Sequence, residues 1–163
     1  MDPSPLSIYT YAMNIYLDID GVLVNKEGQP SPYVDEFIRA CVDSRAELYW
    51  LTTWCRTSDE AAIRHLRAVG MKPESIALLQ EHCKPTNWDA NKTDAIDFSK
   101  PFYWFDDVIF EEEYKTLEMH QAIPGWIKID LKNFPNQLKE CIELVEKLGD
   151  TRSEEHTSEL QSH

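Results

Sequence analysis

The chain has 163 residues, of which 42% are hydrophobic, and its formal net charge is −13. This length suits a single domain with one core, and the acidic balance argues against a protein that binds nucleic acid through a general electrostatic surface. No apolar run approaches the roughly 20 residues that a membrane-spanning helix needs. The first twelve residues lack the basic start and long apolar segment of a secretory signal, so we expect a cytoplasmic protein with no membrane partner.

The two ends of the chain are expected to lie outside the folded domain. We predict one domain over residues 13–149, preceded by an N-terminal extension over residues 1–12. Residues 150–163 are predicted to form a disordered tail. Within it, residues 152–162 read RSEEHTSELQS, which has no apolar periodicity and resembles the in-frame translation of a sequencing-library adapter. This segment is therefore left out of the predicted fold.

In chain order, the domain begins with a strand over residues 14–19, where NIYLDI is short, apolar and rich in strand formers. A helix is predicted over residues 31–42, because apolar residues recur there at spacings of three and four. Ser31 followed by Pro32 is a suitable start for this helix. Residues 47–52, which read ELYWLT, predict a second buried strand.

The next predicted helix, over residues 57–70, has recognisable ends. Thr57 and Glu60 have the spacing of a capping box, and Gly70 stands where a terminal glycine belongs. The apolar run SIALL, residues 75–79, predicts a third and weaker strand.

The last part of the domain continues the alternation of helices and strands. A short helix is predicted over residues 91–98 and a fourth strand over residues 102–105. Residues 111–120 predict a helix with an acidic first turn, which the helix dipole favours. A fifth strand over residues 126–130 and a final helix over residues 136–148 complete the series.

Strands that alternate with helices indicate right-handed crossovers and a parallel sheet with helices on both faces. We therefore predict a single α/β domain of three-layer, Rossmann-like architecture, with a five-stranded parallel sheet of order 5-4-1-2-3. In such sheets, ligands bind at the carboxyl ends of the strands. Polar residues follow three of the predicted strands at this edge: Asp18 and Asp20, then Thr52, then Asp106 and Asp107.

The spacing of the aspartates indicates a metal site. Two carboxylates held close together repel each other, and one of them takes up a proton unless a cation lies nearby. Asp18 and Asp20 form such a pair, and Asp107 supplies a third hard oxygen ligand. Ligation by oxygen alone suits Mg²⁺, which is the predicted cofactor. Gly21 lets the chain turn sharply after the pair and keeps backbone amides near a substrate anion.

Four segments together resemble the motifs of the haloacid dehalogenase (HAD) superfamily, in that family's order. They are DIDGVL (18–23), LYWLT (48–52), a downstream lysine, and WFDD (104–107). The resemblance covers residues 13–148. It implies a HAD-like fold in which Asp18 attacks phosphorus and forms an aspartyl-phosphate.

The resemblance also implies the remaining roles. Asp20 would act as general acid and then as general base, and its main-chain carbonyl would touch the metal. Thr52 would hydrogen-bond a phosphoryl oxygen. Asp18 and Asp107 would hold Mg²⁺ directly, and Asp106 would bind a metal-bound water or the lysine.

Two of these positions have alternatives within the sequence. Lys92 opens the short helix before the fourth strand, which is where the family has its lysine, but Lys84 and Lys100 compete with it. Thr53 would replace Thr52 if the second strand ran one residue longer. Lys84 and Thr53 therefore stay as candidate substrate-binding residues.

The intervals between the motifs are too short for a folded cap domain. An uncapped site stays open to water, and it suits a phosphate on a large partner such as a protein or a nucleic-acid end. It also suits a small substrate when another chain supplies the lid. The motifs are also similar to small capless HAD domains associated with RNA repair proteins, which implies an RNA end or a nucleotide phosphate as substrate. The predicted function is Mg²⁺-dependent phosphomonoester hydrolysis. A phosphotransferase and a non-catalytic HAD-like binding or regulatory module are the alternatives.

Aromatic and basic residues near the motifs allow two interpretations. Trp54 and Trp88 could stack on a nucleobase or an aromatic leaving group, or they could simply pack in the rim or the core. Arg64, His65 and Arg67 form only a small basic cluster.

Overall fold

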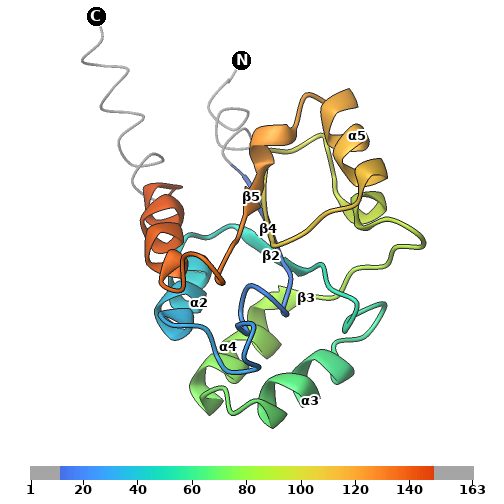
Figure 1. Ribbon diagram of the computed structural model, residues 1–163. Helices are drawn as coiled ribbons and strands as arrows, with labels where there is room; N and C mark the ends of the chain where they lie inside the picture. The colour runs from blue at the N-terminus through green and yellow to red at the C-terminus, as the bar shows by residue number, and fades with distance from the viewer. Residues whose placement is uncertain (1–11, 149–163) are drawn as a thin grey trace, which may run out of the picture.

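The computed structural model describes residues 12–148, and within this range five strands form one sheet in the order β3-β2-β1-β4-β5 (Figure 1). The strands are β1 (Asn14–Leu17), β2 (Glu47–Trp50), β3 (Cys83–Lys84), β4 (Phe102–Asp106) and β5 (Trp126–Lys128). All four pairings between neighbouring strands are parallel, and the order reads 5-4-1-2-3 from the opposite edge. The predicted tail over residues 150–163, and all but the last residue of the predicted N-terminal extension, lie outside the described residues.

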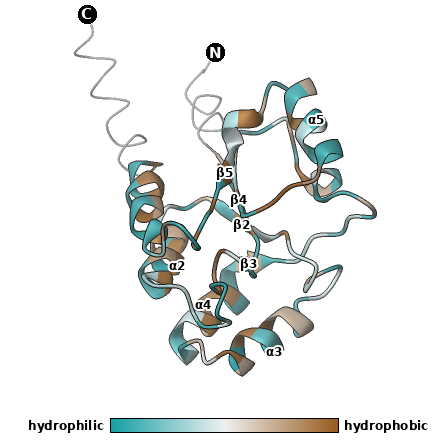
Figure 2. Ribbon diagram, viewed as in Figure 1, coloured by the Kyte–Doolittle hydropathy of each residue, from teal (hydrophilic) through white to brown (hydrophobic). Residues whose placement is uncertain are grey.

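Helices cover both faces of the sheet, which gives the α/β, Rossmann-like architecture that the alternation of elements predicts. They are α2 (Val34–Asp43), α3 (Glu60–Ala68), α4 (Pro73–His82), α5 (Glu111–Met119), the 3₁₀ helices η1 (Lys92–Ala95) and η2 (Ile123–Gly125), and a C-terminal helix over residues 137–148. Figure 2 shows that several helices have one hydrophobic and one hydrophilic side. No helix between residues 12 and 148 is long and apolar enough to cross a bilayer.

Each face of the sheet has its own core, because successive side chains of a strand point to opposite faces. From β1, Ile15 and Leu17 enter the larger core, which also contains residues of α2, α3, α4 and the C-terminal helix. Tyr16 enters the smaller core on the other face, with Trp104 of β4 and Leu117 of α5. The segment that includes η1 lies on this second face, and this brings it toward the ends of β1 and β4.

The third strand is not where the sequence predicts it. Residues 75–79 lie within α4, and β3 contains only two residues, beginning at Cys83. A short apolar run does not distinguish a strand from a buried helix, and Pro73 supplies a helical φ at the first position of α4. The interval between Thr52 and Lys92 therefore contains two helices and a short strand.

The predicted starts of two helices are also wrong, whereas one predicted end is confirmed. Ser31 does not cap α2, since its hydroxyl donates to a main-chain carbonyl of the preceding loop and the helix begins after Tyr33, whose φ is 68°. Thr57 has a φ of 75°, and α3 begins only at Glu60. Gly70 follows α3 with a φ of 89°, the left-handed conformation expected of a terminal glycine.

A buried glutamate ties α5 to the segment before β4. Glu113 is only 2% exposed. Its Oε2 accepts the main-chain N–H of Lys92 at 2.7 Å, and its Oε1 accepts the main-chain N–H of Phe110 at 2.8 Å. The other glutamates of this acidic first turn, Glu111 and Glu112, are exposed. One side chain of the helix thus fixes the backbone on both sides of β4.

We expect Glu113→Ala to lower the free energy of unfolding by about 2–5 kcal/mol, because it leaves two main-chain donors without their buried acceptor. Urea denaturation measures this loss. The neighbouring change Glu112→Ala, on the exposed side of α5, should stay within about 0.5 kcal/mol of the wild type. Equal losses in the two variants would contradict the role assigned to Glu113.

Candidate active site

The register of the sheet brings the ends of β1 and β4 together. Leu17 pairs with Phe105 in the parallel ladder, and the main-chain N–H of Asp18 donates to the carbonyl of Phe105 at 3.1 Å. The next residues in register are Asp18 and Asp106. Side chains in register on neighbouring strands point to the same face, so both carboxylates lie on the face that carries η1.

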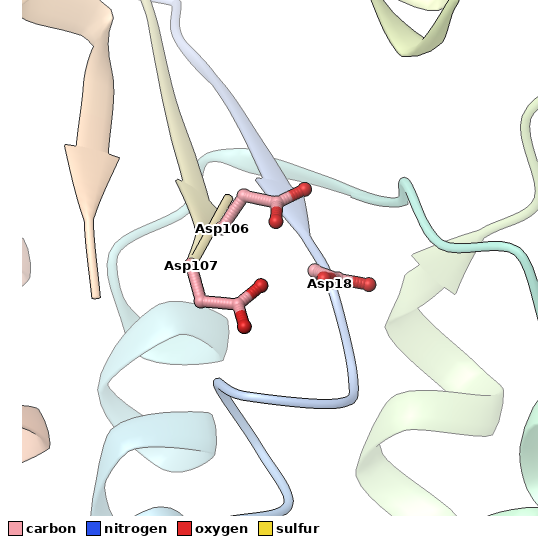
Figure 3. Close-up of side chains that lie close together, drawn as sticks. All are labelled: Asp18, Asp106 and Asp107. Carbon is pink, nitrogen blue, oxygen red and sulfur yellow. The ribbon is translucent and has the colours of Figure 1, made fainter. Parts of the chain in front are cut away.

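Three aspartates converge at this point, as Figure 3 shows. Asp18 follows β1, Asp106 is the last residue of β4, and Asp107 comes directly after it. One carboxylate oxygen from each lies within 4.8 Å of the others. The prediction that the tips of the first and fourth strands gather acidic side chains is confirmed for these three residues. The carboxylate of Asp20 is not part of the cluster.

Lys92 lies against two of the three carboxylates. Its Nζ is 2.7 Å from Asp106 Oδ2 and 3.5 Å from Asp18 Oδ1. Burial disfavours the ammonium, but the charges of Asp18 and Asp106 outweigh this effect, so the pKa of Lys92 is raised. The ammonium is therefore a permanent positive charge between two acids at the base of the site.

Burial raises the pKa of both acids that contact Lys92. For Asp106, which is 1% exposed, desolvation and the charge of Asp18 raise the pKa to about 8, against the opposing effect of Lys92. Desolvation also raises the pKa of Asp18, although Lys92 and a hydrogen bond with Asp106 act in the other direction. Two buried carboxylates this close repel each other when both are ionised, and positive charge beside them relieves the repulsion.

Asp107 lies on the other side of the cluster, against the loop that follows β1. Gly21 of this loop has a φ of 89°, and a Cβ atom there would lie only 2.3 Å from Asp107 Oδ2. Only glycine fits such a position, since the conformation and the contact both exclude a side chain. Lys26 of the same loop donates to Asp107 Oδ2 at 2.7 Å, and this hydrogen bond is the main reason that the pKa of Lys26 is raised.

Asp20 has its own set of partners. Its Oδ2 accepts the indole N–H of Trp54 at 2.8 Å, and its Oδ1 lies 3.0 Å from Nε2 of His65. The Trp54 and His65 rings stack, with centroids 4.0 Å apart and an interplanar angle of 9°. One face of the Trp54 ring is thus covered by His65. Trp88, by contrast, is 8% exposed and packs beneath the guanidinium of Arg56.

The two candidate threonines after β2 differ in burial. Thr52 is 1% exposed, whereas Thr53 is exposed. The Thr52 hydroxyl oxygen accepts the main-chain N–H of Trp54 at 3.3 Å, which closes a tight turn. The same turn therefore carries both the buried hydroxyl and the indole that contacts Asp20.

Of the candidate lysines, only Lys92 lies in the acidic cluster. Lys84 belongs to β3, forms an ion pair with Glu47 at the start of β2, and lies over the ring of Tyr49. Lys26 is a cation at the site that sequence reasoning missed, because its loop has no periodicity that predicts what it contacts. Trp54 and His65 were recognisable as residue types near the motifs, but nothing in the sequence pairs them with Asp20.

The cluster fits a divalent cation in its donor chemistry. Its ligands are hard carboxylate oxygens, which suit Mg²⁺. Asp18 and Asp106 are buried acids with raised pKa values, and Lys26 and Lys92 bring positive charge against the same oxygens that a cation would contact. The three carboxylates of the cluster therefore need positive charge beside them.

Comparison of the chain with protein-family models, with curated proteins and with solved structures found no match. The function of the site is therefore inferred from its own residues and their geometry.

We expect Gly21→Ala to destabilise the protein more than Gly28→Ala. Both glycines lie in the loop after β1 with positive φ, at 89° and 78°, but a Cβ at Gly28 meets nothing within 4 Å. The conformational strain alone costs about 1–2 kcal/mol, and the clash with Asp107 should add about 1–3 kcal/mol for Gly21→Ala. Urea denaturation gives both values. If Gly21→Ala lowers the free energy of unfolding no more than Gly28→Ala does, the contact between position 21 and Asp107 is not tight.

The raised pKa values predict how stability depends on pH when divalent cations are removed. Between the unfolded pKa of 3.8 and the folded value of about 8, Asp106 holds a proton that the unfolded chain has released. Stability should therefore fall as pH rises through this range, by up to about 1.4 kcal/mol per unit. Asp106→Asn should flatten this slope, whereas the exposed change Asp89→Asn should leave it unchanged. Urea denaturation in EDTA at pH 5.5 to 8.5 tests this, and parallel curves for wild type and Asp106→Asn would refute it.

Proposed function

We propose that this chain is a Mg²⁺-dependent phosphomonoesterase of the HAD type, which acts through an aspartyl-phosphate on Asp18. One observation carries the proposal: three carboxylates from the ends of β1 and β4 lie together, and the ammonium of Lys92 contacts two of them, at 3.5 Å from Asp18 and 2.7 Å from Asp106. A buried cluster of like charges costs free energy, and a catalytic site for an anionic substrate explains why the chain has one.

In the first step, a carboxylate oxygen of Asp18 attacks phosphorus as the bond from phosphorus to the leaving oxygen breaks. The Lys92 ammonium next to Asp18 favours the ionised, nucleophilic form of this carboxylate and attracts the phosphoryl oxygens. Asp20 gives its proton to the leaving oxygen, so the product departs as an alcohol. The buried hydroxyl of Thr52 has a proton to donate to a phosphoryl oxygen.

In the second step, a water attacks the phosphorus of the aspartyl-phosphate and the bond from phosphorus to Asp18 breaks. Asp20, now ionised, takes the proton that the water loses. Phosphate leaves, and Asp18 and Asp20 return to their starting states. The two aspartates therefore divide the chemistry into a nucleophile and a proton carrier.

The residues that would hold a divalent cation are Asp18 and Asp107, together with Asp106 and the main-chain carbonyl of Asp20. When bound, Mg²⁺ supplies positive charge that offsets the negative charge of the phosphoryl group. Lys26, which contacts Asp107 from an exposed loop, would compete with a cation for that carboxylate.

The absence of a cap in the described residues supports the proposed substrate class. Between residues 12 and 148, both intervals that separate the motifs contain only helices, loops and strands of the domain itself, with no additional folded unit that could act as a cap. An open site accepts a phosphate that projects from a large molecule, such as an RNA end or a phosphoprotein, as well as a nucleotide phosphate. Because the chain carries a net charge of −13, binding should depend on contacts at the phosphate rather than on long-range attraction.

We expect the purified chain to hydrolyse 4-nitrophenyl phosphate in the presence of Mg²⁺ and to lose this activity in EDTA. Asp18→Asn should reduce kcat by about 10³-fold or more, because it removes the nucleophile, whereas Asp89→Asn should leave it unchanged. Acid quenching during turnover, followed by mass spectrometry, should find phosphate on the peptide that contains Asp18. A panel of 5′- and 3′-phosphorylated oligoribonucleotides, nucleotides and phosphopeptides then identifies the preferred substrate.

Each alternative function has its own outcome in the same assay. Equal activity in the wild type and Asp18→Asn would refute the proposed nucleophile. Transfer of phosphate to an added alcohol, in place of its release, would identify a phosphotransferase. No turnover of any ester in the panel would favour a non-catalytic module.

A further inference from the structure

Asp20 is the most exposed of the motif acids, and yet both of its carboxylate oxygens are engaged. Its side chain is 59% exposed, so by itself it would exchange freely among rotamers. The indole N–H of Trp54 holds Oδ2 at 2.8 Å, and Nε2 of His65 contacts Oδ1 at 3.0 Å. Two contacts on two different oxygens fix the position of the carboxyl group and the orientation of its plane.

The two partners of Asp20 also hold each other. The indole of Trp54 and the imidazole of His65 are nearly parallel, with an interplanar angle of 9° and a centroid distance of 4.0 Å. Trp54 lies in the loop after β2, and His65 lies on α3. The stack therefore connects two elements that are separate from the β1 loop, in which Asp20 itself lies.

The loop that carries Trp54 is itself anchored. The main-chain N–H of Trp54 donates to the hydroxyl of Thr52, and the main-chain N–H of Cys55 donates to the carbonyl of Thr52 at 3.1 Å. Thr52 and Cys55 are both buried. Trp54 thus projects from a rigid turn, which makes it suited to hold another side chain in place.

We propose that Trp54 and His65 are positioning residues that hold Asp20 in the orientation required for proton transfer to the leaving group. This inference rests on the proposed function, in which Asp20 is the general acid and base. Neither residue contacts the acidic cluster in a hydrogen bond or ion pair that the structure shows; each acts through Asp20. Proton transfer is sensitive to such placement, since a displacement of about 1 Å can cost about 100-fold in rate.

The choice of leaving group separates positioning of an acid from a general structural role. An alkoxide must be protonated as it departs, whereas 4-nitrophenolate leaves without help. The parameter kcat/KM covers only the steps up to departure of the leaving group, so it isolates the first proton transfer from hydrolysis of the aspartyl-phosphate. Benzyl phosphate and 4-nitrophenyl phosphate form a matched pair, because both present an aromatic group of similar size.

We expect Trp54→Phe and His65→Ala each to lower kcat/KM for benzyl phosphate by about 10- to 100-fold. The fold-loss of kcat/KM for 4-nitrophenyl phosphate should be at least tenfold smaller than the fold-loss for benzyl phosphate. Trp54→Phe keeps a ring for the stack but removes the N–H, so it isolates the hydrogen bond. His65→Gln keeps a side-chain amide that can donate or accept a hydrogen bond, as the imidazole can, and should recover most of the activity that His65→Ala loses. Asp20→Asn should show the same preference for the good leaving group.

His82→Ala is the matched control, because His82 lies at the end of α4 with Glu81 as its partner and has no contact with Asp20. It should leave kcat/KM unchanged for both esters. Thermal unfolding of each variant shows that the assays are made on folded protein.

The possible outcomes distinguish this inference from the function on which it rests. If the wild type turns over both esters but the Trp54 and His65 variants lose equally on the two, or lose nothing on benzyl phosphate, the positioning role is wrong and the phosphatase stands. If the wild type turns over neither ester, the proposed function fails and the role of the pair fails with it.

Discussion

The structure depends on how the chain accommodates three carboxylates at the junction of β1 and β4. Parallel register forces Asp18 and Asp106 together, and burial makes their mutual repulsion stronger than it would be in water. Lys92 makes this arrangement possible, since it contacts both acids. The position of Lys92 depends in turn on Glu113, whose carboxylate accepts its main-chain N–H. A chain of contacts thus runs from the first turn of α5 to the tip of the central strand.

One face of the sheet and the loop after β1 contribute different parts of the site. The face that carries Tyr16 and Trp104 supplies Lys92, and Trp104 itself donates to Asp106 at 3.1 Å. The loop after β1 supplies Gly21 and Lys26, both of which contact or closely approach Asp107. The adjacent side chains Asp106 and Asp107 therefore experience different surroundings, one deeply buried and one accessible to the loop. This difference suits the roles proposed for them, in which Asp106 supports the lysine and Asp107 would bind the cation directly.

Much of this could be predicted from sequence, and the reasons for the misses are physical. Acids that follow strands of a parallel sheet must meet at one edge, which is why Asp18, Asp106 and Asp107 were predictable as neighbours. The position of β3 was not predictable, since the run at residues 75–79 suits a helix as well as a strand. Lys26, Trp54 and His65 lie in loops or on a helix surface, where their partners depend on tertiary structure that no local pattern encodes.

The outer strands of the sheet have a further consequence for the protein in solution. β3 has two residues and β5 has three, and each contains a lysine, Lys84 and Lys128. A strand at the margin of a sheet exposes unpaired amide and carbonyl groups to which other chains can attach, and short, charged margins resist such attachment. Edge strands of this kind hinder other chains from pairing with the hydrophobic strands at the centre of the sheet.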